Sequence, residues 1–556
     1  MPNRQRTLIV SIALLVAVCL AYCGIWRFEF VHYDDNTHIF GNERVSTGLS
    51  LGNVGWAFRQ FNGAQWIPLT WLSFMADVSL FGLNPGAMHS VNIALHALNA
   101  VLLFLLLHRL TREFWPAAAV AAIYALHPVN VESVAWLSER KNVLSTVFWL
   151  LSTLSYVRYA EGRRHAWMLA CFLCLALGLM VKAMLVTLPC TLLLLDAWPL
   201  GRNRTTSWPR LVLEKLPLFA LSALASYLQM KAAANDGLLW EGGDAPSFAY
   251  RAMNAGANVL QYMRLIFIPT DYAPMLPLPR EIPVAMGLAG WAFSAATLAL
   301  GWRLRASAPY VLVGFLWFLG TQFPVSGIVG AGDAVRCDRY LYIPEIGILI
   351  AIVWALQKSV AKLSREAAFT LAAVILGTLA WLTHETAAHW RNTTALATHA
   401  TAVSPESVPA HKLAGWVFAH DGKFAEALRH YDAALHLAPG HLEIRCSRAV
   451  VLAKLGRRES SIAEFRTILA ASPDHLEAKV NLGMQLFATG DLPQARAILA
   501  QITTPGANAA TIQYWLARIA HLEGKHEEAK RRYTEALQLA KDEPWMDEAL
   551  DWMKLL

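Results

Sequence analysis

SVNIALHALNAVLLFLLLHRL, residues 90–110, is a predominantly apolar run long enough to cross the hydrocarbon core of a bilayer as a helix. The chain of 556 residues is 56% hydrophobic and only 16% charged, whereas soluble domains carry about 25% charged residues. Runs of similar length and character recur at Thr7–Trp26, Asn142–Tyr159, Ala166–Val181, 212–231, 284–302, 309–329, 341–357 and 366–383. We therefore expect an all-α, polytopic membrane domain.

The net charge and the cysteines indicate neither a nucleic-acid-binding protein nor a metalloprotein. The formal charge is +7, but the basic residues lie in short loops between apolar runs rather than on one soluble face, so nucleic acid is not an expected partner. Most of the seven cysteines lie inside apolar runs, where a thiol behaves as a small hydrophobe. Cys171 and Cys174 form a lone C-x-x-C pair, and a zinc site needs more ligands. No metal site is predicted.

Basic residues also predict the orientation of the chain. Arg4 and Arg6 precede the first apolar run, which we interpret as a signal anchor with a cytoplasmic N-terminus. Residues 255–283 end in several prolines and are expected to form a re-entrant or interfacial segment. The last span then exits near His384, and the chain after Trp390 is periplasmic or lumenal. The cytoplasmic side receives Arg109, Arg112, Arg158, Arg163, Arg164, Arg202, Arg204, Arg210, Arg303, Arg305, Lys358, Lys362 and Arg365, as the positive-inside rule requires.

The C-terminal quarter carries a repeat of 34 residues. Four glycines hold this spacing, and each has a small residue seven positions before it and another five positions after it. A packing side chain follows nine positions after each glycine. The glycines are Gly422, Gly456, Gly490 and Gly524, and the packing residues are Tyr431, Phe465, Leu499 and Tyr533. The period is that of tetratricopeptide repeats. We expect a membrane domain over 1–390, a linker over 391–410, and about four repeats with a terminal capping helix over 411–556.

Charged residues at the predicted outer ends of spans are candidates for function, because charge near lipid costs free energy. Asp34 and Asp35 directly follow the first span, and a carboxylate there would suit a general base. The alternative is a helix N-cap or a solvated turn, and spacing does not separate the two aspartates.

Two further segments carry outer charges. Residues 127–142 are predicted to form a short amphipathic helix with Glu132, Trp136 and Glu139 on one face. Arg140 and Lys141, together with Lys182, would clamp a lipid phosphate, or the helix would simply be solvated at the interface. In the second segment, 337–344, Arg339 either joins that clamp or only neutralises Asp338.

The motifs at these positions are YDD at 33–35, WIPLTWLS at 66–73, FGLNPGAMHSVNIALHALNA at 81–100, HPVNVESVAWLSERKNVLS at 127–145, KAMLVTLPCTLLLLDAWPL at 182–200 and DRYLYIP at 338–344. With them the chain resembles a family of bacterial polytopic proteins with C-terminal tetratricopeptide repeats, related to the eukaryotic transmembrane and tetratricopeptide-repeat O-mannosyltransferases. The resemblance covers nearly the whole chain.

This resemblance implies a C-type glycosyltransferase fold with about 11–13 membrane segments, an acidic residue in the first outer loop (27–88) as catalytic base, and inversion at the sugar. Asp34 or Asp35 takes the role of the base. The residues expected to bind the donor phosphate are Arg140, Lys141, Lys182 and Arg339. The residues expected to shape the pocket are Trp66, His89, Glu132, Glu139, Asp338 and Tyr340.

The resemblance also implies the partners and the location. The expected donor is a polyprenyl-phosphate sugar, with mannose as one candidate, and the expected acceptor is a Ser or Thr hydroxyl of a periplasmic protein bound by the repeats. No cofactor is firmly expected, and a divalent cation at the phosphate stays open. The location is the bacterial inner membrane. The alternatives are a transferase acting on an envelope glycan or lipid, and a non-catalytic membrane scaffold for the repeats.

Overall fold

The computed structural model describes residues 3–61, 65–235, 246–276, 281–328, 336–502, 507–540 and 543–555. Every regular element within these ranges is a helix, as the sequence predicts. The chain divides into two compact units, Met1–Ser404 and Pro405–Leu556. The range predicted as a linker, 391–410, contains helix α18 (Thr393–Val403) and the start of α19 (Val408–His420).

The first unit is a membrane domain. Four of its helices are long and apolar enough to cross a bilayer: α1 (Asn3–Ala21), α5 (Pro85–Thr111), α14 (Val284–Arg303) and α17 (Arg365–Ala387). Helix α6 (Phe114–Leu126) and the helical segment Pro128–Ala135 pass the same test together, with a bend of 52° between them. The described part of the chain therefore holds four such spans, or five if the bent pair is one span.

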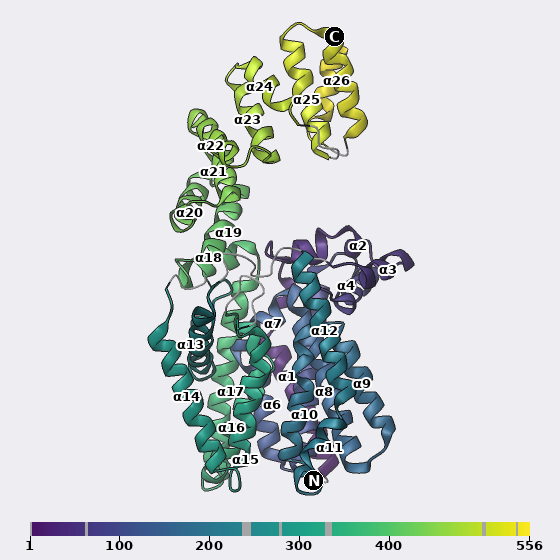
Figure 1. Cartoon of the computed structure of the whole chain (residues 1–556), viewed down its shortest axis with the longest axis vertical. Coiled ribbons are helices and arrows are strands. Elements are labelled where there is room, and N and C mark those ends of the chain that lie inside the picture. Colours follow the sequence, from purple (N-terminus) through teal and green to yellow (C-terminus); the bar gives the residue numbers. More distant parts are fainter. Residues whose placement is uncertain are drawn as a thin grey trace. The chain divides into compact units, whose positions relative to one another are not determined.

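The other apolar windows also form helices, and Figure 1 shows many of them running alongside these spans. Several are too short or too polar to qualify as spans by length and composition alone. They are α8 (Arg140–Gly162), α9 (His165–Leu179), α12 (Leu216–Asn235), α15 (Pro309–Gln322) and α16 (Pro344–Val360); the short helix α10 (Leu188–Ala197) lies outside the predicted windows.

Part of the segment expected to be re-entrant is a regular helix. Helix α13 (Phe248–Phe267) is continuous and packs closely on α14. A Cβ added at Gly290 would lie only 1.8 Å from the backbone oxygen of Gly256, so the two helices approach each other at glycines where no side chain would fit. The chain after α13 is irregular up to residue 276, and residues 277–280 lie outside the described ranges.

The loop after α1, which the sequence predicts to be the first outer loop, forms a small helical cap. Its helices α2 (Glu43–Ser46), α3 (Leu51–Arg59) and α4 (Pro68–Phe81) lie at the end of the bundle opposite the N-terminus (Figure 1). Their shared core includes Val45, Ala57 and Trp71, and Leu137 from the segment before α8 packs into the same core. The loop is thereby fixed against the part of the chain that carries Glu132 and Glu139.

The second unit consists of paired antiparallel helices that repeat as the sequence predicts. The pairs are α19 with α20 (Phe424–Leu437), α21 (Leu442–Lys454) with α22 (Arg458–Ala471), α23 (Leu476–Ala488) with α24 (Leu492–Leu499), and α25 (Ala507–Leu522) with α26 (His526–Leu539), followed by α27 (Met546–Lys554). The four glycines of the period lie in the turns with φ between 73° and 83°, a conformation that favours glycine. Gly415 and Gly483 leave room for the side chains of Tyr431 and Leu499.

Candidate functional site

The segment before α8 is not the single amphipathic helix that the sequence predicts. It forms three short pieces, η3 (Pro128–Asn130), α7 (Val131–Ala135) and η4 (Leu137–Glu139), and Trp136 adopts an extended backbone conformation between the last two. All residues of the segment are buried. The solvated interfacial helix is therefore wrong: the polar side chains of this segment face partners inside the domain.

Glu139 lies at the centre of a buried ion cluster. Its Oε1 is 3.2 Å from Lys141 Nζ and 3.3 Å from Arg339 Nε, and its Oε2 is 3.2 Å from Lys182 Nζ. Burial alone would raise the pKa of Glu139, but the three cations outweigh it and lower the pKa to about 2. Glu139 thus stays ionised and gathers three of the four residues predicted to bind the donor phosphate.

Arg339 is held by a second carboxylate and by two aromatic rings. Its Nη1 lies 2.6 Å from Glu132 Oε1, and its backbone N–H donates to Glu132 Oε2 at 2.8 Å. The guanidinium carbon lies 5.2 Å from the ring centroid of Trp136 and 5.3 Å from that of Tyr340. These contacts fix the position of the guanidinium before any ligand arrives.

The cluster carries an excess of positive charge. Lys141, Lys182 and Arg339 provide three cations against the two carboxylates of Glu132 and Glu139. Lys182 also donates to Asn142 Oδ1 at 2.5 Å, and burial lowers the pKa of its ammonium to about 8 despite Glu139. An unbalanced charge is costly away from water, and a phosphate would offset it.

Asp35 does not cap a helix. Its side chain makes no capping hydrogen bond; instead it accepts from the Val31 backbone N–H at 3.0 Å and from the backbone N–H and hydroxyl of Ser138 at 3.0 and 2.6 Å. Burial raises the pKa of Asp35 to about 6, even though these hydrogen bonds oppose the shift. Asp35 therefore attaches the first loop to the residue that precedes Glu139.

Asp34 has a different environment. It is only half-buried, and its carboxylate makes no hydrogen bond or ion pair with another described residue. The preceding residue, Tyr33, stacks on Trp136 with ring centroids 4.7 Å apart, and Trp136 stacks on Trp390 at 5.4 Å. Because Trp136 also faces Arg339, the aromatic stack connects the Asp34 segment to the ion cluster.

A small cavity lies beside this cluster. It holds about 10 Å³ and is lined by Pro128, Val129, Glu132, Tyr272, Pro274, Asp338, Thr386, His389, Trp390 and His399. Asp338 accepts from the Ala273 backbone N–H at 2.8 Å through one oxygen, while its other oxygen has no partner among the described residues. Burial, and then the neighbouring Glu132, raise the pKa of Asp338.

The other predicted site residues lie away from the ion cluster. Arg140 is completely buried and forms an ion pair with Asp77, and it donates to Asn92 Oδ1 and the Met88 backbone oxygen at 2.8 Å each. As the first residue of α8 it points to a different side from Lys141, since successive helical residues differ by about 100°.

His89 and Trp66 also contact residues outside the ion cluster. His89 is buried with its ring edge-to-face against Phe28, and the Trp66 indole donates to the backbone oxygen of Phe58 at 3.1 Å.

Ser138, Asn142 and Trp390 contribute to the arrangement but were not singled out from the sequence. Ser138 and Asn142 are neutral residues inside a charged stretch, and charge was the signal used. Within the described ranges, no group of three or more His, Cys, Asp or Glu side chains forms that would hold a metal ion. Both carboxylates of the cluster are instead engaged by cations.

Comparison with known proteins gives matches over both units. The family model of dolichyl-phosphate-mannose-protein mannosyltransferases matches residues 69–228, and tetratricopeptide-repeat models match 390–441, 452–519 and 510–543. Protein O-mannosyl-transferase TMTC1 of Homo sapiens is 27% identical over 76% of this chain and 54% of its own length. TMTC4 of Homo sapiens is 24% identical over 78% of this chain and 66% of its own length. The chain spans about half the length of TMTC1.

Two solved structures also align with the chain. ArnT from Cupriavidus metallidurans, bound to undecaprenyl phosphate, aligns over 83% of this chain and 79% of its own with 13% identity and a TM-score of 0.36. YrrB, a tetratricopeptide-repeat protein with a peptide-binding site, aligns over 37% of this chain and 98% of its own with 19% identity and a TM-score of 0.26. The sequence matches confirm the resemblance: the chain is homologous to the protein O-mannosyl-transferases and carries tetratricopeptide repeats.

Proposed function

We propose that this relative of the transmembrane and tetratricopeptide-repeat O-mannosyl-transferases is a membrane glycosyltransferase. It moves a sugar from a polyprenyl-phosphate donor to a Ser or Thr hydroxyl of a periplasmic protein recruited by the repeats. The observation that carries the proposal is the buried cluster of Lys141, Lys182 and Arg339, whose positive charge two glutamates only partly offset.

The cationic cluster binds the donor phosphate. Entry of the phosphate offsets the excess charge, and the ammonium and guanidinium groups donate to its oxygens. As the bond between the anomeric carbon and the phosphate oxygen breaks, negative charge grows on the departing phosphate. Cations fixed beforehand by Glu132 and Glu139 stabilise that charge without rearranging.

Asp34 is the general base. Its carboxylate is not used by other described residues, whereas Asp35 holds the loop in place through Val31 and Ser138. Asp34 takes the proton of the acceptor hydroxyl while the hydroxyl oxygen attacks the anomeric carbon from the face opposite the phosphate. The phosphate leaves with the electron pair of the broken bond, and the configuration of the sugar inverts.

The repeats supply the acceptor. Paired helices of this kind present a long concave surface to peptides or proteins. In the proposed orientation, with a cytoplasmic N-terminus in a bacterial inner membrane, the repeats and the first loop share the periplasmic side. An alkaline-phosphatase fusion at the C-terminus is then active, and a cytoplasmic reporter at the same point is silent; the reverse pattern overturns the orientation.

A transfer assay tests the proposal. Membranes containing the full chain are supplied with a panel of radiolabelled polyprenyl-phosphate sugars, and labelled protein is separated from labelled lipid. We expect one sugar to label protein with the wild type and not with Asp34→Asn. Label that appears only in a glycan or lipid identifies a different acceptor. Equal labelling by wild type, Asp34→Asn and empty membranes would mean that the chain transfers no sugar, and would favour the non-catalytic scaffold.

A further inference from the structure

A second charged hollow lies at the other end of the membrane domain. It has a volume of about 430 Å³ and is lined by Arg109, Arg158, Glu161, Gly162, Arg164 and Trp167. Arg109 stands in the last turn of α5, a helix of 27 residues that begins beside the first loop. Glu161 stands near the end of α8, which begins directly after Glu139, so at 1.5 Å per residue the hollow is about 33 Å from the candidate site.

The hollow contains more positive charge than its surroundings neutralise. Arg109 donates to Glu161 at 2.6 and 3.2 Å. Arg158 lies over the ring of Trp167, 4.4 Å from its centroid, and none of its guanidinium N–H groups donates a hydrogen bond to a described residue. Within the described ranges neither Arg158 nor Arg164 forms an ion pair. Three arginines thus face one carboxylate.

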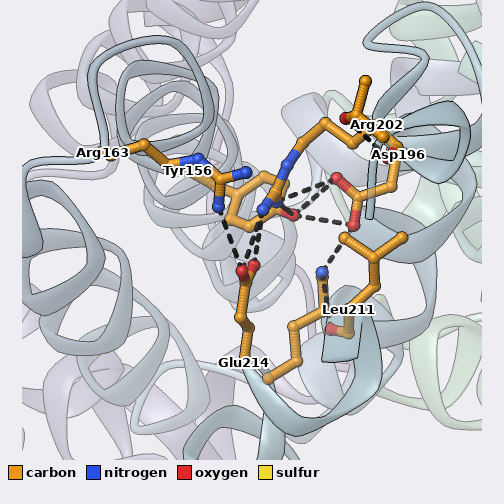
Figure 2. A network of polar contacts seen from close by, with 8 residues as sticks. Tyr156, Arg163, Asp196, Arg202, Leu211 and Glu214 are labelled. Carbon is orange, nitrogen blue, oxygen red and sulfur yellow. Dashed lines mark hydrogen bonds and ion pairs between the residues drawn. The ribbon is translucent and has the colours of Figure 1, made fainter. Parts of the chain in front are cut away.

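The neighbouring carboxylates are already engaged, as Figure 2 shows. Arg163 and Arg202 donate to Glu214 at 3.1 and 2.7 Å. The buried carboxylate of Asp196 accepts from Tyr156 at 2.6 and 2.7 Å and from Lys215 at 2.6 Å. This network ties Arg163, the residue after α8, to Glu214, and both carboxylates are paired within it.

We propose that this hollow binds a phosphate group from the cytoplasmic side. The positive-inside rule explains why arginines occur at this end of the helices, but it does not require them to converge on one open hollow with two guanidinium groups unpaired. Guanidinium donors match phosphate oxygens in pairs, and a tryptophan beside them suits the level of lipid headgroups. The phosphate belongs either to an anionic phospholipid headgroup or to free phosphate.

Glu161 sets the affinity. Its carboxylate competes with the phosphate for Arg109. The negative charge of the carboxylate also repels the phosphate. Removing that charge by Glu161→Gln should strengthen binding, whereas removing charge from the arginines should weaken it. Opposite effects from two changes in one hollow separate ligand binding from general damage to the fold.

The test measures binding to the purified full chain in detergent. Retained phosphatidylglycerol is compared with phosphatidylcholine by native mass spectrometry, with and without inorganic phosphate as competitor. We expect Arg158→Ala with Arg164→Ala to weaken phosphatidylglycerol binding about tenfold or more, and Glu161→Gln to strengthen it several-fold. Arg303→Ala with Arg305→Ala removes the same charge from the same predicted side and should bind as the wild type does.

Each outcome decides one question. Preference for phosphatidylglycerol that excess phosphate does not displace identifies a lipid headgroup, and displacement by millimolar phosphate identifies free phosphate. Equal binding by the wild type, the Arg158/Arg164 double variant and Glu161→Gln overturns the proposal. Parity between that double variant and the Arg303/Arg305 control overturns it as well, because the effect is then one of net charge.

Discussion

Asp35 and Ser138 are joined by two hydrogen bonds, from the Ser138 backbone N–H at 3.0 Å and from its hydroxyl at 2.6 Å, both to the same carboxylate oxygen. The next residue after Ser138 is Glu139, the centre of the ion cluster, and the residue before Asp35 is Asp34. This one contact therefore fixes the proposed base near the proposed phosphate-binding group.

Substitution of the two neighbouring aspartates should have different effects on activity and stability. Asp34→Asn should abolish sugar transfer with little change in melting temperature, because the carboxylate contacts no other described residue. Asp35→Asn should lower the free energy of unfolding by about 1–3 kcal/mol, since a buried, hydrogen-bonded group is altered. Thermal unfolding beside the transfer assay checks both. The assignment is reversed if Asp35→Asn is inactive but fully stable and Asp34→Asn is active.

Substitution of the adjacent cations Arg140 and Lys141 should also have different effects. Arg140→Ala leaves Asp77 as an unpaired buried charge and should cost about 3–5 kcal/mol of stability. Lys141→Ala should leave the melting temperature nearly unchanged and raise KM for the donor. Combining Arg140→Met with Asp77→Leu should restore much of the lost stability. A double variant as unstable as Arg140→Ala would contradict the structural role of Arg140.

Transfer should decline in alkaline solution through Lys182. Burial lowers the pKa of its ammonium to about 8, so in the free enzyme it is charged below that pH and loses its charge above it. The value of kcat/KM for the donor, which reports the free enzyme, should therefore fall above about pH 8. In Lys182→Arg, whose side chain stays protonated, the fall should move to higher pH. An identical pH profile for wild type and Lys182→Arg excludes this titration.

The repeat unit offers matched glycines. In Gly456→Ala the alanine must adopt φ of 78°, at a cost of about 1–2 kcal/mol. Gly483→Ala places a Cβ 2.6 Å from Leu499, and overpacking of this kind costs about 1–3 kcal/mol. Gly440→Ala is the control, because it meets nothing within 4 Å and has no positive φ. In calorimetry of the full chain, the melting temperature of the control should be higher than that of both variants.

Much of the fold was predictable because its signals are periodic and local. The apolar runs at 284–302 and 366–383 coincide with α14 and α17, and the glycines spaced by 34 residues lie in the turns between repeat helices. For residues 127–142 the predicted local structure, one short amphipathic helix, was wrong. At the break Trp136 stacks against Tyr33 and Trp390, which come from distant parts of the chain and leave no periodic trace in the sequence.

The candidate site was predictable as a set of residues but not as a geometry. Charge at the predicted outer ends of spans pointed to Lys141, Lys182 and Arg339, and the structure brings these three together. The same signal selected Arg140, whose partner Asp77 lies in another helix and could not be inferred from spacing. Nor could spacing separate Asp34 from Asp35, since they are distinguished by burial and by the contacts of Asp35 with Val31 and Ser138.

Photo-crosslinking tests the central claim most directly. A polyprenyl phosphate with a diazirine in the isoprene unit next to the phosphate is bound to the full chain, and the labelled peptides are mapped by mass spectrometry. The account predicts label on the peptides around Lys141, Lys182 and Arg339, and loss of most of that label in Lys141→Met with Lys182→Met. Label confined to other segments, with no change in the double variant, would contradict it.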